Sequence, residues 1–332
     1  MAKTRIPALP KLLHRKLYKT GQTRGADDDE IYQNRVLRNS TVIIPYPFWE
    51  YWRPPTPNFY ENGYIVLISP DQFFSSPSFT HELAQKGLNL GYNALVFYET
   101  RQQWINFNPD NYGWVHATSR VGNLGGQFVA RIPATTSLGE GAKINWGFTE
   151  TSIKGAGIRV YEYASANTIE ITRLQLEALF WSCYDSEQIA SDNGMTVEQI
   201  QLRKSAVFDE CQRLSLNDSN QLYGARIINA QGHAICPLCL ESLSAQGFFS
   251  RMEQAQGRAV LDLTITQLNL FHIEELRLGE WNHRPYNLGW GHHHCNVVVK
   301  DSGINETLQW MSAVLQRNAA NGYSIVASNS GI

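Results

Sequence analysis

The chain has 332 residues, a formal net charge of −2, and 43% hydrophobic and 17% charged residues. These values are those of an ordinary globular protein that is long enough for two or three domains. No apolar stretch reaches the roughly 18 to 20 residues that span a bilayer, and the small net charge argues against a protein that coats a polyanion with its whole surface.

Basic residues are concentrated at the N-terminus, where they precede the first acidic residue, Asp27. Residues 1–40 are therefore predicted to form a basic N-terminal arm, which would either lie along phosphates or be a solvated terminus. The basic residues concerned are Lys3, Arg5, Lys11, Arg15, Lys16, Lys19 and Arg24. The arm has no apolar centre and no small-residue cleavage site, unlike a secretory signal. Because the five cysteines are an odd number, we expect free thiols or metal ligands in a reducing compartment, the cytoplasm.

Residues 41–165 are predicted to be a β-rich domain within an α+β multidomain chain. Short apolar segments such as TVIIPYPFW, GYIVLIS and NALVFY are separated by clusters of Gly, Asn, Pro and Ser, which are typical of turns. One helix is expected near THELAQKGLN.

Residues 166–224 have apolar side chains at helical spacing and are predicted to be a helical segment. Within it, the stretch SEQIASDNGMTVEQIQLRKS resembles the helix-turn-helix unit of DNA-binding regulators. Ala190 would let the two helices approach closely, Gly194 would adopt the left-handed conformation of the turn, and Ile200 would anchor the second helix in the core. A plain helical linker is the alternative, because many helical hairpins satisfy the same pattern.

The helix-turn-helix resemblance implies a set of DNA contacts on the second helix. Thr196, Glu198 and Gln201 would face the bases, and Lys204 would contact a phosphate. The negative charge of Glu198 and the single cation on this face weigh against DNA reading by this helix.

Residues 225–332 contain a pattern of metal ligands and end in a predicted helix, NETLQWMSAVLQRNA. Cys236 and Cys239 form a Cys-x-x-Cys turn, and His292 and Cys295 repeat the spacing as His-x-x-Cys. Four such ligands in two paired turns are typical of a closed, tetrahedral zinc site, so we predict structural zinc. The alternative is a pair of free thiols beside a histidine-rich surface turn.

Between these ligand pairs, the sequence resembles the HNH (ββα-metal) nuclease family, in the subgroup whose catalytic hairpin is stapled by zinc. The alternating segment LDLTITQLNLFHI predicts a strand that ends at His272. Asn287 follows this histidine, and Asn296 directly follows Cys295, so the family's pattern of His, Asn and His or Asn occurs here as His272, Asn287 and Asn296. The resemblance covers roughly residues 230–302.

The resemblance implies a role for each of these residues in phosphodiester hydrolysis. His272 would be the general base that takes a proton from the attacking water. Asn287 would hold the loop by hydrogen bonds from its side chain to the backbone, and Asn296 would ligate one Mg²⁺. Lys300 would contact a phosphate. A satisfied structural histidine is the alternative for His272.

The chain departs from the HNH pattern at the residue before the general base. In much of the family this residue is a second metal ligand, whereas here it is Phe271. Either Asn296 and the phosphate hold the ion with additional water, or an acidic neighbour supplies the missing oxygen. We expect Glu274 to do so, because it would share the strand face of His272 if the strand continues.

The organisation as a whole resembles a type II restriction endonuclease with an HNH centre, and its size and layout resemble those of BstXI-type enzymes. The resemblance implies a sequence-specific double-stranded DNA endonuclease that acts as a homodimer, with the β-rich domain recognising DNA. A homing or phage HNH endonuclease, acting as a monomer on one long site, is one alternative. A zinc-stabilised DNA-binding regulator without catalysis is another, for which Phe271 is the best argument.

A second nuclease pattern is much weaker. Asp71, Glu99 and Arg101 resemble the PD-(D/E)xK pattern, but an arginine stands where that chemistry needs a lysine.

Overall fold

The computed structural model describes residues 6–18, 40–119, 123–132, 158–250, 266–277, 280–299 and 302–323. They form two compact units, each with its own hydrophobic core. We call the first the sheet unit; its described residues are 40–169, with the gaps given above, together with 277, 280 and 281. The second, the hairpin unit, contains the other described residues. None of the described helices is long and apolar enough to cross a membrane.

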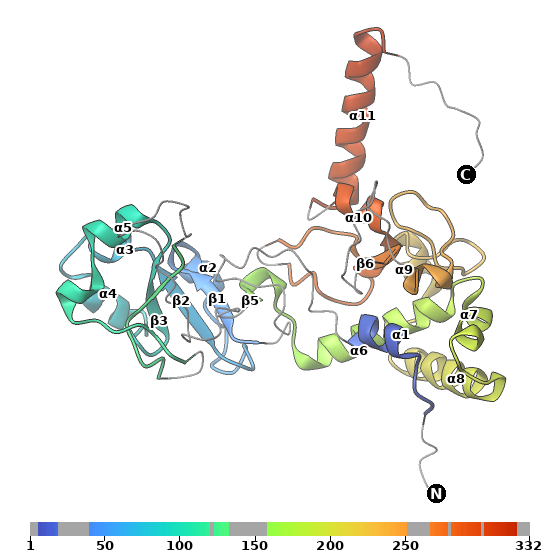
Figure 1. Cartoon of the computed structure of the whole chain (residues 1–332), viewed down its shortest axis with the longest axis horizontal. Coiled ribbons are helices and arrows are strands. Elements are labelled where there is room, and N and C mark those ends of the chain that lie inside the picture. The colour runs from blue at the N-terminus through green and yellow to red at the C-terminus, as the bar shows by residue number, and fades with distance from the viewer. Residues whose placement is uncertain are drawn as a thin grey trace, which may run out of the picture. The chain divides into compact units, whose positions relative to one another are not determined.

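The sheet unit is built on five parallel strands in the order β4-β3-β2-β1-β5 (Figure 1). The strands are β1 Val42–Pro45, β2 Tyr64–Ile68, β3 Ala94–Tyr98, β4 Phe128–Ala130 and β5 Ile158–Arg159. The helices between them are α2 Trp49–Trp52, α3 Pro70–Phe73, α4 Phe79–Gln85 and α5 Arg101–Asn106, and the 3-10 helices are η1 Tyr46–Phe48, η2 Pro109–Tyr112 and η3 Val160–Glu162. Because helices alternate with parallel strands, this part of the chain is α/β, a correction to the predicted β-rich domain of an α+β chain.

The strands of the sheet unit are buried on both faces. In β2, Val66 and Ile68 belong to one core, whereas Ile65 and Leu67 belong to a second core on the opposite face. Strands buried on both sides read as continuous apolar runs instead of alternating ones, and this is typical of parallel sheets. The uninterrupted runs YIVLI and ALVFY were therefore the sequence signal for a parallel sheet.

The hairpin unit combines a helical part with one antiparallel hairpin, β6–β7. Its helices are α1 Lys11–Tyr18, α6 Ala166–Trp181, which begins in the sheet unit, α7 Ser186–Asp192, α8 Val197–Arg213, α9 Ser219–Gly224, η4 Ala245–Phe248, α10 His293–Val299 and α11 Ile304–Ala320. Its strands are β6 Leu268–His272 and β7 Leu288–His292.

The predicted basic arm contributes to the core of the hairpin unit. Residues 11–18 form α1, in which Leu13 and Leu17 are fully buried. The Lys16 ammonium donates a hydrogen bond to the Leu268 carbonyl oxygen at 2.5 Å, and burial lowers the pKa of Lys16 to about 7. This helix therefore differs from both interpretations of the arm, along phosphates or as a solvated terminus. Lys3, Arg5, Lys19, Arg24 and the Arg15 side chain lie outside the described residues.

The helix pair α7–α8 has the packing that the helix-turn-helix pattern predicted. Ala190 is fully buried, Gly194 has a φ of 95°, and Ile200 is 3% exposed. Arg203 of α8 turns inward, where its Nε and Nη2 atoms donate to the two carboxylate oxygens of Glu177 at 2.6 and 2.8 Å. This buried, bidentate ion pair fixes α8 against α6.

Candidate functional site

The β6–β7 hairpin is followed directly by helix α10, which packs against both strands. In its register, Phe271 pairs with Gly289 and His272 pairs with Leu288. Phe271 is fully buried, and a Cβ atom on Gly291 would lie 2.5 Å from its ring. Residue 271 is thus a core position whose aromatic ring occupies the space left by a glycine, which accounts for its departure from the metal-ligand pattern.

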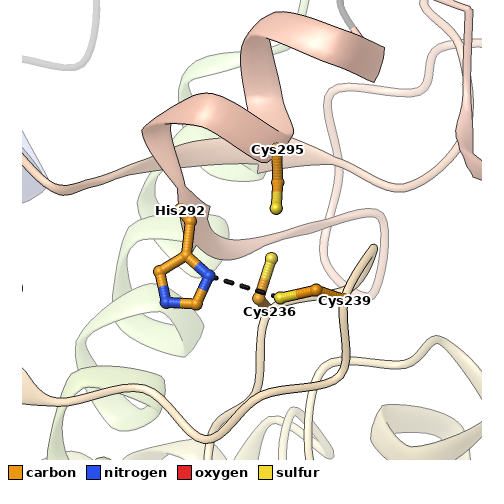
Figure 2. A group of neighbouring side chains, drawn as sticks. All are labelled: Cys236, Cys239, His292 and Cys295. Atoms are coloured by element: carbon orange, nitrogen blue, oxygen red, sulfur yellow. Dashed lines mark hydrogen bonds between the residues drawn. The ribbon is translucent and has the colours of Figure 1, made fainter. Parts of the chain in front are cut away.

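Four side chains converge beside this hairpin (Figure 2). The ligand atoms of Cys236, Cys239, His292 and Cys295 all lie within 4.8 Å of one another, and the His292 Nδ1 atom is 3.3 Å from the Cys239 sulfur. Cys236 and Cys239 come from a turn in which the Leu240 amide donates to the Cys236 carbonyl oxygen at 2.9 Å. His292 ends β7 and Cys295 lies in the first turn of α10.

The chemistry of this cluster fits zinc. Thiolate and imidazole are the ligands of closed structural zinc sites, with Zn–S distances of about 2.3 Å, and a modest closure of the four groups would reach that geometry. Burial by itself would raise the pKa of the Cys236 thiol, but hydrogen bonds from His292 and from nearby backbone amides lower it to about 6. By contrast, burial raises the pKa of Cys211, outside the cluster, to about 12. The thiolate form is therefore favoured at Cys236, whereas burial and the charge of the Cys236 thiolate raise the pKa of Cys239 and of Cys295.

Asn287 fastens the connection between the two strands. It is 2% exposed, and its side-chain oxygen accepts a hydrogen bond from the Glu274 amide at 2.7 Å. Its side-chain nitrogen donates to the Asn282 carbonyl oxygen at 2.7 Å, and the Ile273 amide donates to the Asn287 carbonyl oxygen at 3.0 Å. Together these hydrogen bonds hold the chain immediately after His272.

His272 lies at the end of β6 and is half-buried. Its Nε2 atom is 3.5 Å from the Nδ1 atom of His283, a histidine that is only 4% exposed. Sequence analysis missed His283, because no spacing rule connects a loop residue to the end of a strand eleven positions earlier. The short segment NHRPYN places it four residues before Asn287, and this proximity was the only signal available.

Glu274 was predicted as a metal ligand on the condition that the strand continues past His272. β6 ends at His272, so the alternation of strand faces does not extend to residue 274. The Glu274 side chain is exposed, and its carboxylate lies 3.3 Å from the Arg284 guanidinium. A residue past the end of the strand has no reason to share the face of the base.

The remaining predicted residues of this region lie on or after α10. Asn296 is half-buried on α10. His293 is tied to β6, with its Nδ1 atom 2.9 Å from the Asn269 side-chain nitrogen, whereas the exposed ring of His294 stacks on that of His292. Lys300 lies outside the described residues.

Most of the predicted DNA-reading side chains on α8 have partners within the chain. Thr196 caps the helix by accepting a hydrogen bond from the Gln199 amide. Gln201 and Lys204 both contact Glu187 of α7, and the ammonium of Lys204 lies 2.5 Å from its carboxylate. Glu198 is exposed at the start of the helix.

The structure also shows the positions of Asp71 and Glu99, the two acidic residues of the weaker nuclease pattern. Asp71 lies on α3 and accepts a hydrogen bond from the Gln103 side chain at 2.8 Å. Glu99 follows β3, and burial raises its pKa above the ordinary range. These residues follow the carboxyl ends of neighbouring strands. At the position where the pattern requires a lysine, the chain has Arg101.

No curated protein sequence matches the chain. A crystal structure of a type II restriction endonuclease is similar over 48% of this chain, with 15% sequence identity and a TM-score of 0.29. The match spans 57% of that structure's chain. A sequence model of the family described as BstXI restriction endonuclease matches residues 15–293, which is most of the chain. The chain therefore belongs to the BstXI restriction endonuclease family.

Proposed function

We propose that the protein is a sequence-specific double-stranded DNA endonuclease, a type II restriction enzyme, whose catalytic centre is the β6–β7 hairpin and α10. Membership of a restriction endonuclease family supports the activity. The single observation that carries the assignment of the centre is the position of His272. It lies at the end of β6, beside the connection that Asn287 holds by side-chain to backbone bonds.

In this proposal, hydrolysis follows the chemistry that the HNH resemblance implies. His272 takes a proton from water as the water oxygen forms a bond to phosphorus and the bond from phosphorus to the leaving oxygen breaks. Asn287 keeps the loop beside the base in place. Asn296 would hold Mg²⁺ together with water and the phosphate, and the ion would stabilise the negative charge that develops during the reaction.

The four-residue Cys/His cluster would hold structural zinc. Its residues join the turn at Cys236 to the junction of β7 and α10, so the ion would fix the helix that carries Asn296. A reducing cytoplasm, which we propose as the location, would keep these thiols available as ligands.

Recognition of the DNA sequence would use the sheet unit and helix α8. For α8 to read bases, Gln201 and Lys204 must give up their contacts with the Glu187 carboxylate and contact DNA instead. Glu187→Ala would release both side chains and is expected to tighten DNA binding; unchanged binding would remove α8 from the recognition surface.

We further propose that the protein is a homodimer, because a two-fold site in DNA presents two strands to cut. The surface that supports this proposal is one side of α11, on which Leu308 and Leu315 are 37% and 50% exposed. Glu306 and Arg317 are the only charged residues of this helix.

The sequence of α11 is self-complementary about one point. Leu308 and Leu315 are equidistant from the junction of residues 311 and 312, and their seven-residue spacing places them on the same side of the helix. Two copies of the helix packed antiparallel about a two-fold axis at this junction would place each leucine beside the partner's other leucine. We therefore propose that the exposed apolar side of α11 packs against the same helix of a second copy of the chain.

Sedimentation analysis tests the dimer and its interface. Leu315→Glu is expected to give a monomer, whereas Gln309→Glu, on the polar side of the helix, leaves a dimer. A monomeric wild type, or a dimer that survives Leu315→Glu, would reject this interface.

Cleavage of long natural double-stranded DNA tests the proposed activity. The wild type is expected to give discrete bands with Mg²⁺ and none with EDTA, and His272→Ala to lower the rate at least about 100-fold without changing DNA binding. Cleavage of one long asymmetric site by a monomer would favour the homing endonuclease. Zinc-dependent DNA binding without cleavage in any divalent ion would favour the regulator.

A further inference from the structure

We propose that His283 is the positioning residue of the catalytic base, and that it accepts a hydrogen bond from the Nε2–H group of His272. This inference rests on the proposed function of His272. The His283 Nδ1 atom lies 3.5 Å from the His272 Nε2 atom, and the two ring centroids are 5.7 Å apart.

The position of His283 is fixed by the hydrogen bonds of its neighbours. The Asn282 side-chain nitrogen donates to the Glu275 carbonyl oxygen at 2.5 Å, and the Asn282 carbonyl oxygen in turn accepts from Asn287 at 2.7 Å. Asn282 and Asn287 are both 2% exposed or less. The segment that carries His283 is therefore bonded to the same asparagine that holds the chain after His272.

Burial makes His283 suited to this role. Its side chain is 4% exposed, so water has little access to compete for its contact with His272. A buried polar ring generally requires hydrogen-bond partners, and each ring nitrogen of a neutral histidine is either a donor or an acceptor. His272, by contrast, is only half-buried.

The direction of this hydrogen bond decides whether His272 can act as a base. A neutral imidazole has one N–H group and one lone pair, and the partner of one nitrogen selects the form of the other. If Nε2–H donates to His283, the lone pair of His272 is on Nδ1, which is then the nitrogen that would take the proton from water. When the proton arrives, His272 becomes positively charged, and its bond to His283 becomes a stronger, charge-assisted one.

Four variants test the inference: His283→Leu, His283→Asn, His272→Ala and the control His233→Leu, an exposed histidine of the same unit. An asparagine side chain can place an oxygen acceptor near the position of Nδ1, whereas leucine offers none. We expect His283→Leu to lower the single-turnover cleavage rate on the order of 10- to 100-fold, with DNA affinity unchanged. His283→Asn should recover most of this loss, and His233→Leu should match the wild type.

Two outcomes of the rate measurement would overturn the inference. One is a wild-type rate in His283→Leu. The other is an equal loss of rate in His283→Asn and His283→Leu, together with an equal fall in Tm, because a merely structural histidine behaves in that way.

Nitrogen NMR of the ¹⁵N-histidine-labelled protein separates this inference from the proposed function. The expected spectrum shows His272, assigned by its absence in His272→Ala, protonated on Nε2 in the wild type and in a mixture of forms in His283→Leu. A proton on Nδ1 in the wild type would reject the role of His283. If the wild type cuts no DNA, the enzyme proposal fails, whereas the NMR measurement still decides whether the hydrogen bond exists.

Discussion

The two units of the molecule are stabilised in different ways. In the sheet unit, apolar strand residues are buried on both faces of a parallel sheet, and successive strands pair with one another along most of the sheet. In the hairpin unit, the core draws Leu13 and Leu17 from the N-terminal region, and the candidate site depends on a few polar groups. Burial of apolar side chains therefore stabilises the sheet unit, whereas a small number of sulfur, nitrogen and amide contacts position the residues of the candidate site.

The connection between β6 and β7 belongs to both units. Trp281 is part of the sheet unit, where its ring lies 5.2 Å from that of Phe59 and 6.1 Å from that of Tyr163. Asn282 and His283, which follow directly, are part of the hairpin unit. The backbone that positions His283 is thus continuous with an aromatic cluster of the other unit.

The largest effect is expected from loss of a cluster ligand. Cys239→Ser should abolish zinc binding and remove the cooperative unfolding transition of the hairpin unit, because structural zinc contributes about 10 kcal/mol or more in small domains. Elemental analysis and calorimetry check this prediction. The control is Cys183→Ser, at a buried thiol outside the cluster, which should retain one zinc ion per chain. Equal zinc content in both variants would contradict the assigned ligands.

Removal of a buried side chain from the sheet should destabilise the sheet unit. Leu95 is fully buried in the core on one face of the sheet. Leu95→Ala is expected to destabilise the sheet unit by about 2–5 kcal/mol through lost burial and a cavity. Calorimetry should show a lowered transition for this unit and an unchanged one for the hairpin unit. Tyr92→Ala, at a 57% exposed position, is the control, and a loss as large as that of Leu95→Ala would argue against this core.

A smaller effect is expected at the glycine under Phe271. Gly291→Ala would place a methyl group 2.5 Å from the Phe271 ring, and such overpacking costs about 1–3 kcal/mol. Urea unfolding of the hairpin unit measures this loss. The matched variant Gly224→Ala meets no atom within 4 Å and should be nearly neutral. If the two alanine variants have the same stability, Phe271 is not packed against this strand as described.

The smallest effect at neutral pH is expected from Lys16. Burial lowers its pKa to about 7 in the folded chain, from an ordinary value of 10.5. Between these values the unfolded chain binds a proton that the folded chain does not, so stability should rise with pH, by about 1 kcal/mol between pH 7 and pH 8. Lys16→Met should remove this rise. Urea unfolding over this pH range is the measurement, and an equal slope in both proteins would show that Lys16 titrates normally.

The sequence by itself determined the local features of the molecule. Paired Cys-x-x-Cys and His-x-x-Cys spacings indicated the cluster, alternation in LDLTITQLNLFHI indicated a strand that ends at His272, and Ala190, Gly194 and Ile200 indicated a packed helix pair. These features follow from steric and periodic rules that act within a few residues, so they can be read from short segments.

Only the tertiary structure decided which distant residues meet. It placed Leu13 in a core formed with α6 and later helices, turned Phe271 toward Gly291, and brought His283 to His272. The order of the strands in the sheet unit was decided in the same way. The physical reason is that such contacts depend on packing between segments far apart in the chain, and the free energy of burying them together leaves no fixed spacing in the sequence.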